Sequence, residues 1–194
     1  MSIGDIRGML QYAVESQFQL VNLIKKVDEM ASFAITAMQN AIEAKRTSIT
    51  SPQQSDVHGA VRAFIKTIEE IRDLTAGTAC RELASGSVQK LQQAFTGSQH
   101  VVSVSAITVA EAQLQELDEL QQMSTNLISD VENLTGFTSE DPMVEAATEV
   151  STMAERVPNF STNAINLLNY VNDYLSSIGA APLDTSSGNH GNGS

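Results

Sequence analysis

Apolar residues recur every three to four positions from Ile3 to Arg46. With Ile3 at position a of a heptad, the a and d positions hold Ile3, Ile6, Leu10, Ala13, Gln17, Leu20, Ile24, Val27, Ala31, Ala34, Met38 and Ala41. Sustained spacing of this kind predicts a helix that is packed along its length. The neighbouring e and g positions are also largely apolar, so the stripe is broader than the seam of a two-stranded coiled coil. It predicts a bundle in which this helix has two or more partner helices.

The stretch ITSPQQSD, residues 49–56, predicts the end of this helix and the start of the next. Ser51 is a favourable N-cap and Pro52 suits the first helical position, while Gln54 completes the pattern of a capping box. Because the connection is short, the two helices are expected to be antiparallel neighbours. The first half of the chain therefore reads as a helical hairpin.

Single glycines weaken the helical pattern over residues 77–100. We predict a break near Ser85–Gly86 and a loop over Thr96–His100, because glycine disfavours a helix interior. The following run VVSVSAITV, residues 101–109, is rich in branched residues that favour strands. No second strand is available to pair with it, so helix is the favoured interpretation and strand the alternative.

The second half repeats the logic of the first. Its apolar stripe predicts a long third helix, which Gly136 ends in the manner of a C-cap. Asp141 is the predicted N-cap of a fourth helix, with Pro142 at the first helical position. Pro158 must interrupt that helix, because proline inside a helix removes a backbone hydrogen bond. Gly179 is the predicted end of its last part.

These features predict an all-α fold, an elongated antiparallel helical bundle built from two tandem helical hairpins. The expected divisions are a neutral hairpin over residues 1–100, an acidic hairpin over 101–182 and a disordered polar tail over 183–194. The two hairpins are expected to pack as one bundle. Fold class alone does not determine function.

Negative charge is concentrated in the second hairpin. The whole chain has 11 Lys and Arg against 23 Asp and Glu, a net charge of −12, and Arg156 is the only basic residue after position 100. Such a surface repels nucleic acid and anionic lipids, so neither nucleic-acid binding nor stable membrane insertion is expected. Two interpretations of the excess charge stay open, namely solubility alone and attraction of a basic protein partner.

No arrangement that catalysis requires is evident. None of the three histidines has a Glu or a second His three or four positions later, as zinc and di-iron helices do; they are His58, His100 and His190. Cys80 is the only cysteine, so no intramolecular disulfide is possible, and a buried core position is its favoured interpretation. We therefore predict a protein that is not an enzyme and uses no cofactor or metal.

The segment EAQLQELDEL, residues 111–120, places Glu116, Asp118 and Glu119 close together on a predicted helix. Loose binding of a divalent cation is one interpretation, and a solvated acidic face open to a partner is the favoured one. Phe18 and Phe33 lie on the otherwise polar face of the first helix and are the other candidate interaction residues.

The N-terminal residues MSIGDIRGML carry no basic and apolar signal-peptide pattern, and no apolar run is long enough to span a bilayer. A cytoplasmic location, or export by a leaderless route, is expected. With its hairpin of about ninety residues, the chain resembles the WxG-type helical-hairpin proteins of type VII secretion. The resemblance rests on the helix over 3–46, the turn and the helix from Pro52. The sequence TSPQQSD occupies the place of the Trp-x-Gly turn, and no functional residues are carried over.

The leading hypothesis is a structural or interaction protein, secreted without a leader or associated with secretion, that binds a protein partner or a second copy of itself. The alternative is a membrane-active helical protein that rearranges to insert, with residues 101–110 as its apolar segment. Ten residues fall short of the ~20 that span a bilayer.

Overall fold

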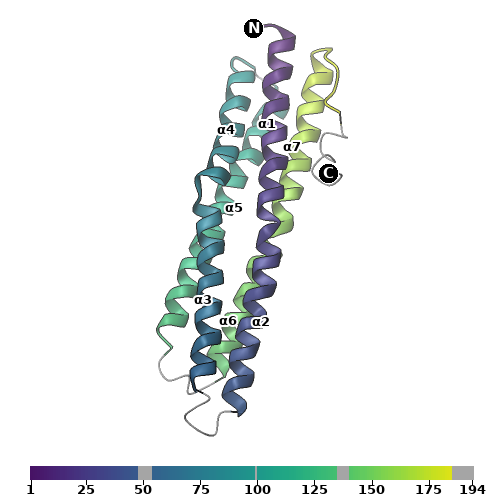
Figure 1. Cartoon of the computed structure of the whole chain (residues 1–194). Helices are drawn as coiled ribbons and strands as arrows, with labels where there is room; N and C mark the ends of the chain where they lie inside the picture. Colours follow the sequence, from purple (N-terminus) through teal and green to yellow (C-terminus); the bar gives the residue numbers. More distant parts are fainter. Residues whose placement is uncertain (48–53, 99, 135–139, 185–194) are drawn as a thin grey trace. The chain divides into compact units, whose positions relative to one another are not determined.

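The computed structural model describes residues 1–47, 54–98, 100–134 and 140–184, and within them it contains helices and loops but no strand. The helices are α1 (Ile3–Ile24), α2 (Lys26–Thr47), α3 (Gln54–Ala76), α4 (Thr78–Ala94), α5 (Val101–Glu132), α6 (Asp141–Glu155) and α7 (Val157–Ser177) (Figure 1). The predicted all-α, antiparallel helical bundle is confirmed. The run over 101–109 is helical, as the sequence favoured.

The chain forms two compact units, and each draws on both predicted hairpins. Unit 1 comprises Met1–Ile24, Gly77–Leu117 and Pro158–Ser194; unit 2 comprises Lys25–Ala76 and Asp118–Val157. The predicted division at residue 100 follows the order of the chain, whereas the units follow the contacts. The chain crosses between the two units four times. Three crossings lie at or next to a helix interruption, at Lys25, Gly77 and Arg156, and the fourth lies inside α5.

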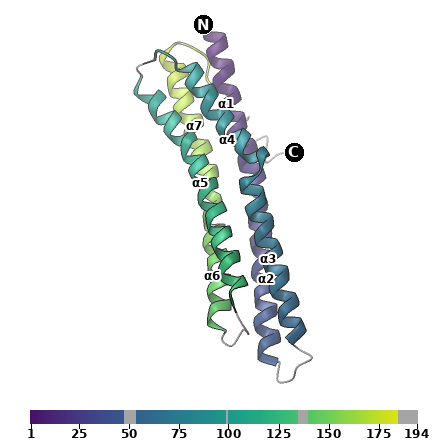
Figure 2. The same cartoon turned by 90° about the vertical axis from the view of Figure 1, so that its left-hand side faces the viewer.

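Unit 1 is held together by apolar packing with a few polar ties. α1 packs against α4 (Figures 1 and 2). The Ser87 hydroxyl donates a 2.9 Å hydrogen bond to the Ala13 carbonyl. Phe95 and Tyr174 meet edge to face with ring centroids 4.8 Å apart. The buried apolar cluster draws on all four helical segments of the unit, with Leu10, Val14, Leu91, Ala106, Ala110, Leu167, Val171 and Leu175 among its members.

Unit 2 places α2 against both α3 and α6. The buried side of α2 is rich in small residues, which let neighbouring helices approach closely. They are Ala31, Ala34, Ala37 and Ala41. Larger side chains from the other helices fill the core between them, including Phe64, Ile68, Ile71, Leu120, Met143, Val150 and Met153.

Several predicted boundaries differ from the observed ones. The predicted break near Ser85–Gly86 is wrong, since Gly86 lies inside α4 and the interruption is at Gly77, whose φ of −69° and ψ of 153° are extended. Burial of Ala84, Ser87 and Val88 on one face keeps the helix formed through the glycine. Likewise the helix predicted over 3–46 is divided at Lys25.

At the start of α6 the prediction is out by one residue. Asp141 is the first residue of the helix, and Glu140 precedes it without a side-chain capping bond. Leu183, placed in the predicted tail, is buried, and its N–H donates a 2.7 Å hydrogen bond to Asn172 Oδ1. The predicted Ser51–Pro52 start, the Gly136 end and residues 185–194 of the tail lie outside the described residues.

Two fully buried amides, Gln17 and Gln113, interrupt the apolar interior of unit 1. Gln113 donates a 2.9 Å hydrogen bond to the Phe160 carbonyl and accepts a 3.0 Å bond from Asn163. Gln17 is fully buried, and neither its amide nitrogen nor its amide oxygen has a hydrogen-bond partner in the structure. A buried polar atom without a partner carries its full desolvation cost, so Gln17 weakens unit 1.

Replacing Gln17 with leucine should stabilise the protein by about 1–3 kcal/mol, because an apolar side chain of similar size removes that desolvation cost. The matched change Gln113→Leu should destabilise it by about the same amount, since it removes the hydrogen bonds that Gln113 makes with the Phe160 carbonyl and the Asn163 amide. Urea denaturation of both variants checks the pair. A change in the free energy of unfolding in the same direction for both variants would contradict the different roles given to Gln17 and Gln113.

Replacing glycine with alanine should change the free energy of unfolding in opposite directions at Gly86 and Gly179. An added Cβ meets nothing within 4 Å at Gly86 or at Gly179, but Gly179 has a φ of +74°. Gly86→Ala should therefore stabilise by about 0.5–1 kcal/mol. Gly179→Ala should destabilise by about 1–2 kcal/mol, because the left-handed conformation disfavours a Cβ. A higher melting temperature for Gly179→Ala than for Gly86→Ala would contradict the helical conformation of Gly86 and the left-handed conformation of Gly179.

Candidate functional site: a groove between α5 and α6

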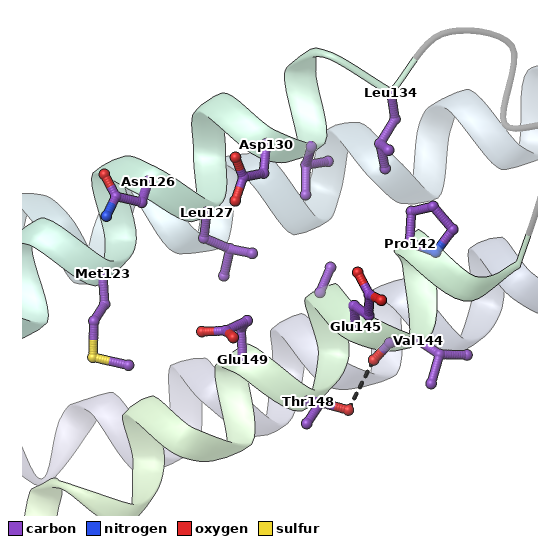
Figure 3. Close-up of a pocket in the computed structure, with 12 residues that line it drawn as sticks. Met123, Asn126, Leu127, Asp130, Leu134, Pro142, Val144, Glu145, Thr148 and Glu149 are labelled. Carbon is purple, nitrogen blue, oxygen red and sulfur yellow. Dashed lines mark hydrogen bonds between the residues drawn. The ribbon is translucent and has the colours of Figure 1, made fainter.

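A groove in unit 2 lies between the C-terminal part of α5 and α6 (Figure 3). It has a volume of about 440 Å³. From α5 and the residues just after it come Met123, Asn126, Leu127, Asp130, Val131 and Leu134, and from α6 come Pro142, Val144, Glu145, Ala146, Thr148 and Glu149. Both walls thus belong to one unit.

The floor of the groove is apolar. Leu127 and Val131 on α5 and Ala146 on α6 are buried, and they follow from the stripe that each helix turns toward the core of unit 2. Met123 lies at one end of the groove, and half-buried Leu134 and Pro142 lie at the other (Figure 3). The short side chain of Ala146 lets the two walls leave space between them, since a larger residue there would fill it.

The margins of the groove are polar and acidic. Asp130 on α5 and Glu145 and Glu149 on α6 are exposed, and the two glutamates extend into the gap between the helices (Figure 3). The Thr148 hydroxyl donates a 2.9 Å hydrogen bond to the Val144 carbonyl, so it is already engaged within α6. No Lys or Arg belongs to the described lining, so the carboxylates give the groove a negative potential.

Two ion pairs hold α6, one near each end. Arg46 at the end of α2 donates hydrogen bonds of 2.9 and 3.1 Å to the two carboxylate oxygens of Glu140, which directly precedes α6. Arg156, directly after α6, pairs with Glu119 on α5. Bidentate Arg–carboxylate geometry fixes orientation as well as distance. These pairs therefore position the α6 wall of the groove.

The Arg46–Glu140 pair shifts both groups. The hydrogen bond from Arg46 lowers the pKa of the Glu140 carboxyl below its usual value of 4.5. The same hydrogen bond and the carboxylate charge raise the pKa of the Arg46 guanidinium. Since both side chains are in contact with solvent, the pair is screened by salt and contributes little to stability.

None of the candidate residues that we singled out in the sequence lines the groove. Phe18 is half-buried and packs against the core of unit 1, whereas Phe33 on α2 is 65% exposed. Glu119 pairs with Arg156, and Glu116 accepts a 3.5 Å hydrogen bond from Asn159. Their roles in binding stay predictions. Sequence reasoning missed the groove residues. The signal for them is that Asp130, Glu145 and Glu149 lie next to apolar positions on two successive helices.

The other candidates for chemistry lie apart. Cys80 is buried in α4, as predicted, and His58 and His100 are exposed. Among the described residues, no three His, Cys, Asp or Glu side chains are grouped to hold a metal ion. No helix in the described part of the chain combines the length and hydropathy that crossing a lipid bilayer requires. Residues 101–110 begin α5, with Ser103, Ala106 and Ala110 buried.

The Arg46–Glu140 pair should make the stability of the protein depend on pH. Because the folded-state pKa of Glu140 is lowered, its contribution is present above 4.5 and is lost as pH falls through the folded value. Glu140→Gln should thus lower the melting temperature slightly at neutral pH and leave it unchanged in acid. Glu145→Gln, on the same helix, should not lower it at neutral pH. A deficit in Glu140→Gln that persists unchanged in acid would contradict this role.

Comparisons with known proteins give no relative for this chain. No protein-family model, no curated protein and no solved structure matches it.

Proposed function

We propose that this chain is a non-enzymatic helical protein that acts by binding another protein, and that the groove between α5 and α6 is its binding site. The observation that carries the proposal is the combination of an apolar floor with polar margins. Protein interfaces have this organisation, because apolar contacts at the centre supply affinity and the polar rim supplies orientation.

The chemistry of the lining supports binding over catalysis. The described lining contains no His, Cys, Lys, Ser or Tyr. A hydroxyl nucleophile needs an adjacent base to accept its proton, and the hydroxyl of Thr148 instead donates a hydrogen bond to the Val144 carbonyl. General acid catalysis at neutral pH needs a carboxyl group shielded from water. Asp130, Glu145 and Glu149 are exposed.

The proposal extends to the location and to self-association. A binding protein of this kind acts in the cytoplasm or, if exported without a leader, outside the cell, in keeping with the resemblance to the WxG-type proteins. A second copy of the chain is the other candidate partner, and of the two phenylalanines Phe18 and Phe33 only Phe33 presents an exposed ring to it. The half-buried ring of Phe18 is already engaged in unit 1.

A photo-crosslinking residue placed at two matched asparagines tests the proposal in cells of the source organism. Asn126 lies at the margin of the groove, and Asn166 lies on α7; both are exposed and helical. Irradiation should give a discrete protein adduct from position 126 and none from position 166. The mass of the adduct, read by mass spectrometry, separates a different protein from a second copy.

Three results would count against the groove. They are no adduct at position 126, equal adducts at both positions, and a diffuse ladder without a defined partner. The first would remove the groove as a binding site, and the other two would show that contact does not depend on the groove.

A further inference from the structure

We propose that the partner supplies a basic amphipathic helix, which lays its apolar face on the floor of the α5–α6 groove and its Lys and Arg side chains on the acidic margins. This inference rests on the proposed function and identifies the occupant of the same site.

The walls of the groove favour a helix over other peptide conformations. Added strands need the open edge of a sheet, and the described residues contain no strand. Polyproline helices bind grooves lined by aromatic rings, and no aromatic residue belongs to the described lining. Two helices with a gap between them instead present ridges and grooves into which a third helix packs.

The size of the groove matches a short helix. The wall from Met123 to Leu134 is about 17 Å long at 1.5 Å per residue, which corresponds to about three turns of a partner helix. The volume of about 440 Å³ accommodates a few aliphatic side chains, not a folded domain. A partner helix would therefore contribute apolar residues at i, i+3, i+4 and i+7, the spacing that puts them on one face.

Charge selects a basic helix. Three carboxylates stand on the margins at Asp130, Glu145 and Glu149, and the described lining holds no cation to neutralise them. The two arginines that the structure places at the ends of α6 are engaged, since Arg46 pairs with Glu140 and Arg156 with Glu119. An acidic helix would be repelled by the carboxylates on both walls. A basic helix would form ion pairs with them, and the negative potential would raise its association rate.

The segments outside the described residues offer no substitute for this partner. Residues 48–53, 99, 135–139 and 185–194 contain no Lys or Arg. None of these segments has apolar residues at helical spacing. A basic helix must therefore come from another polypeptide.

Two displayed peptide libraries test the inference on the full chain. Both contain helices of about 14 residues, long enough to exceed the groove at 1.5 Å per residue, with the same randomised aliphatic positions at i, i+3, i+4 and i+7. Outward positions are Lys and Arg in one library and Glu and Asp in the other. Binders should come from the basic library only, and their amide chemical-shift changes should centre on residues 123–134 and 142–149.

Two double variants with the same change in net charge provide the control. Glu145→Lys with Glu149→Lys reverses the α6 margin, and Glu111→Lys with Asp173→Lys reverses exposed carboxylates in unit 1. Affinity for the selected peptides should fall about tenfold or more in the first variant and less than about threefold in the second. Circular dichroism of both variants checks that they are folded.

The inference is overturned if neither library gives a binder, if acidic peptides bind as well, or if both double variants lose affinity equally. Shift changes confined to residues outside the groove would also overturn it. A discrete crosslink from Asn126 together with any of these results would leave the proposed function standing and remove only the basic helix. If position 126 gives no crosslink and the basic peptides do not bind, the groove is removed as a protein-binding site.

Discussion

Each helix of this protein must bury one apolar stripe, and the two units exist because each brings four stripes together. The stripe that starts in α1 continues into α2, where Ile24 and Val27 are both buried on either side of the interruption at Lys25. Uninterrupted spacing lets one long segment contribute to two cores. The interruptions at Gly77 and Arg156 likewise lie where the chain passes from one unit to the other. The division into units therefore follows from which helices cover each apolar stripe, not from the order of the chain.

Helical content was predictable from the sequence because it depends on local spacing, which the stripes and the loop near Gly97 reveal directly. The helix interruptions were harder to predict. Gly86 and Gly77 are the same residue type within one helical run, and only burial of the flanking side chains against other helices keeps one of them in a helix. The groove was missed for a related reason, since Asp130 and Glu149 are near each other only through folding, and single-helix periodicity shows each merely as a polar residue on a stripe.

Polar groups lie both inside the units and at their surface. In the core of unit 1, Gln113 donates a hydrogen bond to the Phe160 carbonyl, whereas Gln17 has no hydrogen-bond partner in the structure. A buried amide at a heptad a position costs stability and can specify which helices pair, and in what register. In unit 2, Thr67, Thr75 and Ser124 are buried, while the ion pairs at the ends of α6 and the groove margins lie at the surface.

The ion pairs show how the negative charge of the second half is distributed, which net charge alone does not. Excess carboxylates spread evenly over a surface aid solubility and need no arrangement. Here Arg156, the only cation after position 100, is paired with Glu119, and Arg46 from the first half is paired with Glu140. The two arginines are thus engaged at the ends of α6, and the described lining of the groove holds no cation beside its glutamates. Negative charge therefore lies next to the apolar lining of the groove, and this juxtaposition is the observation behind the proposed basic partner helix.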